Sequence, residues 1–416
     1  MTVNAADWIT VPIRELYDGL YDGPHATPKP SDSGPVFLGI RNVTDYGCLD
    51  LSEIRHIAEE DYASWTRRVE PRTNDLVFTY EATLNRYALI PPGFRGCLGR
   101  RMALIRTNPL KVDVRFLLYY FFTDEWRAVI RRNMLTGATV DRIPLTTFPE
   151  FPVRVPPLPI QQRIAGILSA YDELIENSQR RIKILETMAR ALYREWFVNF
   201  RFPGHESVPR VPSSLGEIPQ GWEAIAFTEI ADVLSGGTPK TGTPEYWDGD
   251  IPFFTPRDAP DCFYVEVADK HVTELGLSKC ASQLYPPDTV FITARGTVGK
   301  VALPSVPMAM NQSCYALLGK PGVSQRFLFL MTLQQVEYLK TNTGGATFDT
   351  IVVDTFRRMQ IAKPPNSLIA AFTRNVDAVF EQVNTLQRQT QNLRRTRDLL
   401  LPRLLSGQVD VEGVDQ

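Results

Sequence analysis

The sequence of 416 residues predicts an α+β fold in which two similar α+β domains are joined by two long helices forming an antiparallel coiled coil. Three observations predict this class. The two halves of the chain repeat each other, each copy ends in an apolar heptad pattern behind a Pro-Pro pair, and short strand-like runs precede each pattern. A chain of this length is also expected to form two or three domains rather than one core.

The internal repeat consists of three short matches that occur in the same order in both halves. The matched segments begin at Trp8 and Trp222, at Asp75 and Asp288, and at Gly137 and Gly345, with offsets of 214, 213 and 208 residues. Identity is low outside these patches. We therefore expect two copies of one fold whose surfaces differ.

The helices are predicted from heptads that follow Pro156-Pro157 and Pro364-Pro365. The first helix is expected from 160 to about 200, and its predicted a positions are Leu168, Ile175, Ile182, Ala189 and Trp196. The second is weaker at Thr390 and Arg397 and ends near Gly407. Because the order along the chain is domain, helix, domain, helix, a side-by-side pair must be antiparallel. A helical bundle inside one compact domain is the alternative, and the low-identity repeat disfavours it.

The predicted domains are 1–155, the first helix 156–201, a linker with the second domain at 202–363, and the second helix with a tail at 364–416. The proline- and glycine-rich stretch 202–222 is expected to be the linker. Strands are expected at 36–40, 76–78, 251–254, 289–292 and 300–303, and short helices at 114–132 and 325–342.

Composition excludes several classes of protein. The five cysteines are scattered and the four histidines are unclustered, so neither a zinc site nor a disulfide framework is predicted. No methylation motif of the Asn-Pro-Pro-Tyr type, no hydrolytic triad and no cofactor site can be argued. The start of the chain lacks a secretion pattern and no segment is apolar enough to cross a membrane, so we expect a cytoplasmic protein.

The formal net charge of −2 is unusual for a protein that binds nucleic acid. Seven basic residues nevertheless lie between Arg86 and Arg115, against one acid. Segregated charge of this kind can give a domain a basic face without a basic total. Ordinary surface arginines explain the same pattern equally well.

Five segments together resemble one family, the DNA specificity subunits of type I restriction–modification systems, over nearly the whole chain. They are residues 156–165, 214–222, 235–239 together with 246–252, 294–300 and 399–407. The resemblance implies a non-catalytic subunit with two target recognition domains, each reading one half of a bipartite site in double-stranded DNA. It also implies helices that set the gap between the half-sites, docking of two methyltransferase subunits, and assembly with restriction subunits.

Candidate DNA contacts follow from residue type and position. Arg41 and Arg257 follow matching strands, and arginine is the commonest reader of guanine. Gly296 to Lys300 lacks the spacing of a phosphate loop, which favours a turn that carries basic residues toward DNA. The full set of candidates is Lys29, Arg41, Arg86, Thr139, Thr238, Lys240, Arg257, Arg295, Lys300 and Thr347. Thr139 and Thr347 belong to a Gly-Ala-Thr segment that recurs in both copies, which suits either phosphate contacts or a shared turn.

The first domain departs from the second at the turn, because Ala82-Thr83-Leu84 aligns with Arg295-Gly296-Thr297 at the offset of 213. Two other classes of function stay open at this point. An enzyme would methylate or cut DNA by itself, and a coiled-coil scaffold would bind proteins without sequence-selective DNA binding.

Overall fold

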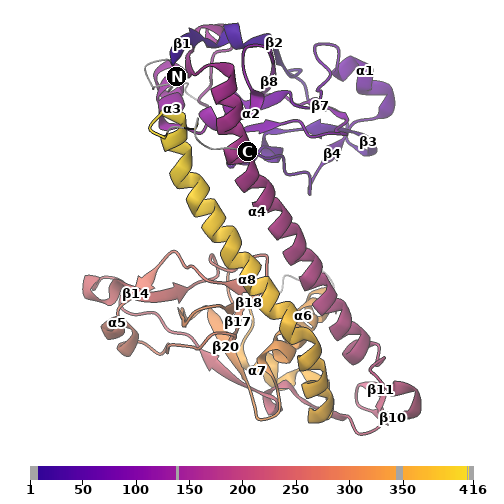
Figure 1. Cartoon of the computed structure of the whole chain (residues 1–416). Helices are drawn as coiled ribbons and strands as arrows, with labels where there is room; N and C mark the ends of the chain where they lie inside the picture. Colours follow the sequence, from indigo (N-terminus) through magenta and orange to yellow (C-terminus); the bar gives the residue numbers. More distant parts are fainter. Residues whose placement is uncertain (1–7, 137–139, 343–349, 410, 412–416) are drawn as a thin grey trace. The chain divides into compact units, whose positions relative to one another are not determined.

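The computed structural model describes residues 8–136, 140–342, 350–409 and 411. They group into two compact units, Met1–Leu174 with Leu393–Gln416, and Ile175–Asn392. Each unit combines one α+β domain with a segment of each long helix, α4 (Leu158–Tyr193) and α8 (Asn366–Leu405), as Figure 1 shows. The predicted fold class is confirmed.

The two helices run antiparallel within each unit. In the first unit, the Arg163 guanidinium of α4 donates to a carbonyl beyond the end of α8 at 3.4 Å. Asp172, further along α4, pairs with Arg397, which lies earlier in α8, at 2.6 Å. In the second unit, Phe372 near the start of α8 packs on the π-helical turn Arg194–Val198 that follows α4.

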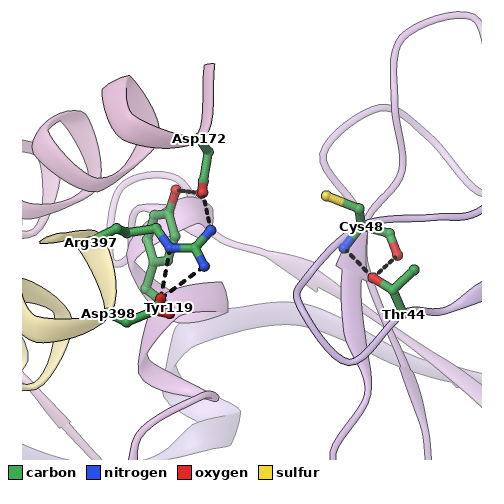
Figure 2. Close-up of polar contacts among 6 residues, drawn as sticks. All are labelled: Thr44, Cys48, Tyr119, Asp172, Arg397 and Asp398. Carbon is green, nitrogen blue, oxygen red and sulfur yellow. Dashed lines mark hydrogen bonds and ion pairs between the residues drawn. The ribbon is translucent and has the colours of Figure 1, made fainter. Parts of the chain in front are cut away.

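The predicted heptads describe the packed faces of both helices. All five predicted a positions of the first helix are buried, four of them in α4 and Trp196 in the π-helical turn after it, because apolar side chains at this period face the partner helix. The two weak positions of α8 also face inward. Thr390 is buried and its hydroxyl donates to the Leu386 carbonyl at 2.8 Å. Arg397 is held by Asp172, which also accepts from the Tyr119 hydroxyl at 2.5 Å (Figure 2).

The first domain contains a four-stranded antiparallel sheet in the order β2-β8-β5-β6 and a three-stranded sheet in the order β4-β3-β7. Strand β1 pairs with β9 beside them. The strands are β1 (Ile9–Pro12), β2 (Tyr17–Asp22), β3 (Ser31–Leu38), β4 (Arg55–His56), β5 (Leu76–Thr79), β6 (Tyr87–Leu89), β7 (Gly96–Leu98), β8 (Met102–Thr107) and β9 (Pro152–Val155). The helices are α1 (Tyr62–Trp65), α2 (Val114–Tyr120) and α3 (Asp124–Asn133).

The second domain has a five-stranded sheet in the order β13-β20-β17-β18-β15 and a three-stranded sheet in the order β16-β14-β19. Its main strands are β12 (Glu223–Ala226), β13 (Ala231–Ser235), β14 (Trp247–Phe254), β15 (Tyr264–Val265), β16 (His271–Val272), β17 (Val290–Thr293), β18 (Val301–Pro304), β19 (Ala309–Met310), β20 (Cys314–Gly319) and β21 (Gln360–Lys363). The helices are α5 (Glu274–Ser278), α6 (Gln325–Asn342) and α7 (Val353–Arg358).

Two expectations about local structure are corrected. The single helix expected at 114–132 is two helices, because Thr123 caps α3 by accepting from the Trp126 amide at 3.2 Å. The expected linker is folded. It contains the hairpin of β10 (Arg210–Ser213) and β11 (Gly216–Pro219), and Trp222 packs on three phenylalanines around it.

The outer matches of the repeat are confirmed by equivalent hydrogen bonds. The Ile13 amide donates to the Phe151 carbonyl at 2.9 Å, and the Phe227 amide donates to the Met359 carbonyl at 2.8 Å. These two bonds are related by the predicted offsets of 214 and 208. They close the same strand pair in each copy, β1 with β9 and β12 with β21.

The middle match is displaced by one residue from the prediction. The Thr79 hydroxyl donates to the Thr83 carbonyl, and the Thr293 hydroxyl donates to the Thr297 carbonyl. These equivalent bonds give an offset of 214 instead of 213. A slip of one residue matters in a strand, because it moves every side chain to the opposite face.

Backbone angles support the corrected offset. Ala82 and Gly296 have φ values of 72° and 77°, and Asn85 and Gly299 have φ values of 60° and 76°. Both copies therefore turn through the left-handed region at the same two places. The first domain does so with residues that adopt this region less readily than glycine.

The corrected offset changes the predicted departure of the first domain. Glu81, and not Ala82, occupies the place of Arg295. Arg86 occupies the place of Lys300, so both copies carry a cation where β6 and β18 begin.

Candidate nucleic-acid interface

In each domain, several of the candidate residues lie at one edge of the antiparallel sheet. In the first domain, β2 and β5 end at this edge and β6 and β8 begin there, since neighbouring strands run in opposite directions. In the second domain, β13 and β17 end and β18 and β20 begin at the corresponding edge. Arg86 and Arg41 lie at the first edge, and Arg295, Arg257 and Thr238 lie at the second.

Arg41 is exposed on a braced turn, the 3-10 helix Ile40–Asn42 that follows β3. The buried Asn42 side chain accepts from the Gly39 amide at 3.0 Å and donates to the Asp50 carbonyl at 2.9 Å. Further along the same loop, the Thr44 hydroxyl and the Cys48 backbone exchange two hydrogen bonds, of 2.8 Å and 3.0 Å (Figure 2). The other polar groups named in this loop therefore have hydrogen-bond partners within the domain, and the loop holds Arg41 at the surface.

Arg86 supports the same loop through one hydrogen bond. Its guanidinium donates to the Val43 carbonyl at 3.2 Å, two residues from Arg41 along the chain. The structure thus brings two predicted contacts, Arg41 and Arg86, to one place. Lys29 is exposed on the segment between β2 and β3.

Arg257 is the structural counterpart of Arg41. Each follows the end of a matching strand by three residues, and each strand end accepts the same bond, from Gly99 to Leu38 at 2.8 Å and from Asn311 to Phe254 at 2.9 Å. In the second domain the loop is braced by a carboxylate in place of an amide: Asp258 accepts from the amide and the hydroxyl of Thr255, each at 2.7 Å. Arg257 is exposed.

Thr238 and Lys240 lie on the loop after β13. The Thr238 hydroxyl donates to the side chain of Gln312, which is exposed two residues before β20. Lys240 is exposed, and its carbonyl accepts from the Trp247 indole at 3.3 Å. The indole therefore fixes the backbone of this loop while the ammonium group stays in solvent.

Arg295 and Lys300 begin and end one turn, but their side chains differ in surroundings. Arg295 is exposed. Lys300 pairs with Asp261 and lines a cavity of about 420 Å³ beside α4 and α6, together with Arg190 and Tyr193. Lys300 is therefore already engaged with a carboxylate, whereas Arg295 presents its guanidinium to solvent.

Thr139 and Thr347 lie outside the described residues. The residues that follow them join each sheet in the same way, because the Ile143 amide donates to the Tyr80 carbonyl at 2.7 Å and the Ile351 amide to the Ala294 carbonyl at 2.9 Å. These bonds mark where the segment ends in each copy.

Three polar residues at the edges were not among the candidates predicted from the sequence. Glu81 and Arg101 form an ion pair at 3.2 Å in the first domain, and Gln312 binds Thr238 in the second. Arg101 lies in the basic run that the sequence displays, but its pairing depends on a turn between β7 and β8. Among the described residues, no helix is long and apolar enough to span a membrane.

The sequence matches the profile of the family described as "Type I restriction modification DNA specificity domain" at residues 66–187 and 219–391. The MjaIX specificity subunit of a type I restriction enzyme of Methanocaldococcus jannaschii is 32% identical over 156 residues, which is 36% of each chain. The HindI specificity subunit of Haemophilus influenzae is 23% identical over 331 residues, covering 66% of this chain and 72% of that protein.

The crystal structure of a type I restriction–modification S subunit from M. genitalium is similar over 95% of this chain and 96% of that one. The TM-score is 0.60 and the identity is 17%, so this likeness concerns the fold.

Proposed function

Because the chain belongs to the family of type I restriction modification DNA specificity domains, we propose that it selects the DNA site for a type I complex and leaves the chemistry to other subunits. Each α+β domain reads one half of a bipartite site. The observation that carries this proposal is the pair of matched sheet edges. Each edge presents an exposed arginine on a braced loop, Arg41 in one copy and Arg257 in the other.

The cations at these edges contact DNA through two kinds of bond. Bonds to phosphates give affinity that falls with salt, and bonds to base edges give the sequence preference. Lys29, Lys240 and Lys300 have point charges suited to phosphates. Thr139, Thr238 and Thr347 supply hydroxyls, which meet either group.

The two long helices set the gap between the half-sites and dock two methyltransferase subunits. Their antiparallel packing in each unit supports this role, since a packed helix pair resists sliding. Outward-facing residues that include Leu174, Ile184 and Met188 leave apolar surface on α4 for partners. Restriction subunits assemble with this core. Because its net charge is −2, the chain binds DNA firmly only in the complex, where partner subunits add contacts to the DNA.

The experiment is methylome sequencing of cells that carry or lack this gene with its methyltransferase gene. We expect one bipartite methylated motif to disappear with the gene. Insertion of one heptad after Leu174 and one after Asn392, where the chain passes between the compact units, should keep both half-site sequences and change their gap. An unchanged methylome refutes the proposal, and altered half-sites refute the spacer role. If the chain assembles with other proteins but the complexes bind DNA without sequence preference, the chain is a scaffold instead.

A further inference from the structure

At the sheet edge, the two copies can be compared position by position. Gly23 and Gly236 are equivalent, because their amides donate to the first residue of β8 and of β20 at 2.9 Å and 3.2 Å. A Cβ atom on either glycine would lie 2.2 Å from the Gly99 carbonyl oxygen or 2.0 Å from that of Asn311. These two glycines, together with the offset of 214 for the turns at Ala82 and Gly296, determine which residues of the two edges are equivalent.

Two positions at the edge keep their charge and four do not. The retained cations are Arg41 with Arg257 and Arg86 with Lys300. The four changed positions are Asp22 with Ser235, Glu81 with Arg295, Arg100 with Gln312, and Arg101 with Ser313. Two copies of one fold that read different half-sites require such a division, because phosphates are the same in every half-site and bases are not.

Three of the four changed residues of the first domain, Asp22, Glu81 and Arg101, belong to one polar cluster, and the fourth, Arg100, is exposed next to Arg101 in the chain. The Arg101 guanidinium lies 3.2 Å from the Glu81 carboxylate, and Arg68 donates to Asp22 at 2.5 Å. Between them, Tyr80 is only 6% exposed, and its hydroxyl has no hydrogen-bond partner among the described residues. Burial raises the pKa of Tyr80, and the charges of Asp22 and Glu81 raise it further, while the Arg101 backbone and the Arg68 charge lower it by less; the hydroxyl therefore stays protonated and able to donate.

Arg101 also has a backbone that arginine rarely adopts. The turn from β7 to β8 is closed by a bond from the Met102 amide to the Gly99 carbonyl at 3.3 Å, and Arg101 has a φ of 73° in it. This is the place in a tight turn where glycine is favoured. The counterpart turn in the second domain has the same length and closing bond, yet Ser313 has no positive φ. Strain of this kind persists where a side chain must be held in one direction.

We propose that the four changed positions read base edges, and that the two retained cations contact phosphates. The inference rests on the proposed function. In the first domain, Arg101 donates to the acceptor pair of a guanine and Glu81 is its positioning residue. In the second domain, Arg295 takes the place of Glu81, and Gln312 presents an amide of the kind that pairs with adenine. Arg41 and Arg257 then contact the phosphate backbone of DNA, although their residue type alone would also suit contacts to guanine.

A purely structural role explains the cluster less well. The ion pair, with its Arg101 and Glu81 side chains 31% and 23% exposed, can stabilise the fold, but the strained backbone of Arg101 and the buried hydroxyl of Tyr80 both lower stability. The Tyr80 hydroxyl has no hydrogen-bond partner among the described residues, and the Arg101 Nε lies 3.2 Å from a Glu81 carboxylate oxygen without forming a hydrogen bond. If a base edge enters the cluster, both groups can donate to it.

The test uses the complex of this chain with its methyltransferase subunits and a DNA library randomised in both half-sites. Arg101→Ser gives the first domain the residue of the second. We expect the preference for guanine at one position of one half-site to fall about tenfold or more, while the other half-site and the gap stay the same. Glu81→Gln should weaken the same preference while affinity for non-cognate DNA rises, because a carboxylate that repels phosphates is removed; a purely structural role would instead predict a loss of binding to all sequences.

The matched control is Arg14→Ser, because Arg14 also pairs with a carboxylate, Glu150, but precedes β2 at the opposite edge of the sheet. It should leave the selected motif unchanged. Thermal unfolding of each variant checks that the domain folds. If Arg101→Ser weakens binding equally for all sequences, or alters nothing, the inference is overturned. If the unaltered complex selects no motif at all, the proposed function itself is overturned.

Discussion

The network of Arg397, Asp172 and Tyr119 allows one prediction with a definite size (Figure 2). Arg397→Leu gives α8 an apolar residue at its predicted a position, but it leaves the Asp172 carboxylate without its cation. Breaking a fully buried pair destabilises a protein by about 3–5 kcal/mol, and breaking an exposed pair by about 0–1 kcal/mol. The Arg397 and Asp172 side chains are 18% and 38% exposed, so the loss should lie between these limits, at about 2 kcal/mol.

Removing the Tyr119 hydroxyl and the Asp172 carboxylate together with Arg397 should reverse the effect. In the triple variant Tyr119→Phe, Asp172→Leu, Arg397→Leu, Asp398 loses its pairing with Arg397 but is 62% exposed, and no buried charge or hydroxyl of the network is left without a partner. Replacing a whole buried polar set by apolar residues is often neutral or stabilising. We therefore expect the unfolding free energy of the triple variant to lie within about 1 kcal/mol of the original.

The assay is urea unfolding of the purified chain, combined with hydrogen exchange of peptides that cover 393–405. Hydrogen exchange is needed because two compact units need not unfold in one step. Exchange in this segment should speed up in Arg397→Leu and return toward the original rate in the triple variant. If the single variant matches the original chain in both measurements, the network does not hold α8 in place.

Three further predictions concern the second unit. Burial raises the pKa of Glu186 to about 7, so the folded state disfavours its charged form; its contribution to stability is fully present below about pH 4.5 and is lost as pH rises through 7. Glu186→Gln should therefore stabilise the unit by roughly 1–3 kcal/mol at pH 8 and leave urea unfolding at pH 4 nearly unchanged; equal effects at both pH values would contradict this. Arg257→Ala should weaken DNA binding by the complex for all sequences alike and reduce the slope of log affinity against log salt by about one, and a change of motif would disprove the phosphate assignment. Gly236→Ala should lower the melting temperature, since its Cβ would lie 2.0 Å from a backbone oxygen, whereas Gly242→Ala, which meets nothing within 4 Å, should not; equal melting of the two variants would contradict the close approach.

The helices could be predicted well from sequence because one physical rule governs them. Burial follows the heptad period, so Leu168 and Trp196 identify the packed face without any knowledge of the partner helix. The polar residues at predicted a positions could be located from the sequence, but their partners could not. Arg397 is recognisable as a charged residue at an a position, yet its partner Asp172 lies 225 residues away along the chain.

The sheet edges were harder to predict from the sequence, because identical residues in the two copies favoured an alignment that is wrong by one residue. Asp75 and Asp288 match as residues, but the equivalent positions are related through backbone angles, which Ala82 shares with Gly296 in spite of their different chemistry. Local sequence does not record a φ value that tertiary contacts impose. The Glu81–Arg101 pair was missed for a related reason, since it depends on the turn that precedes β8.

The pairing of cations at the first edge bears on the low net charge. Arg101 and Arg68 each contact a carboxylate, that of Glu81 and that of Asp22 respectively. A paired arginine must give up its carboxylate, or share it, before it can contact a phosphate, so it contributes less to nonspecific affinity than an unpaired one. The same carboxylates accept hydrogen bonds and repel phosphates that approach in the wrong place. Acidic residues at the edge therefore lower affinity for DNA in general and favour the half-site whose bases satisfy the arginines, which is how a chain with a net charge of −2 can still discriminate between sequences.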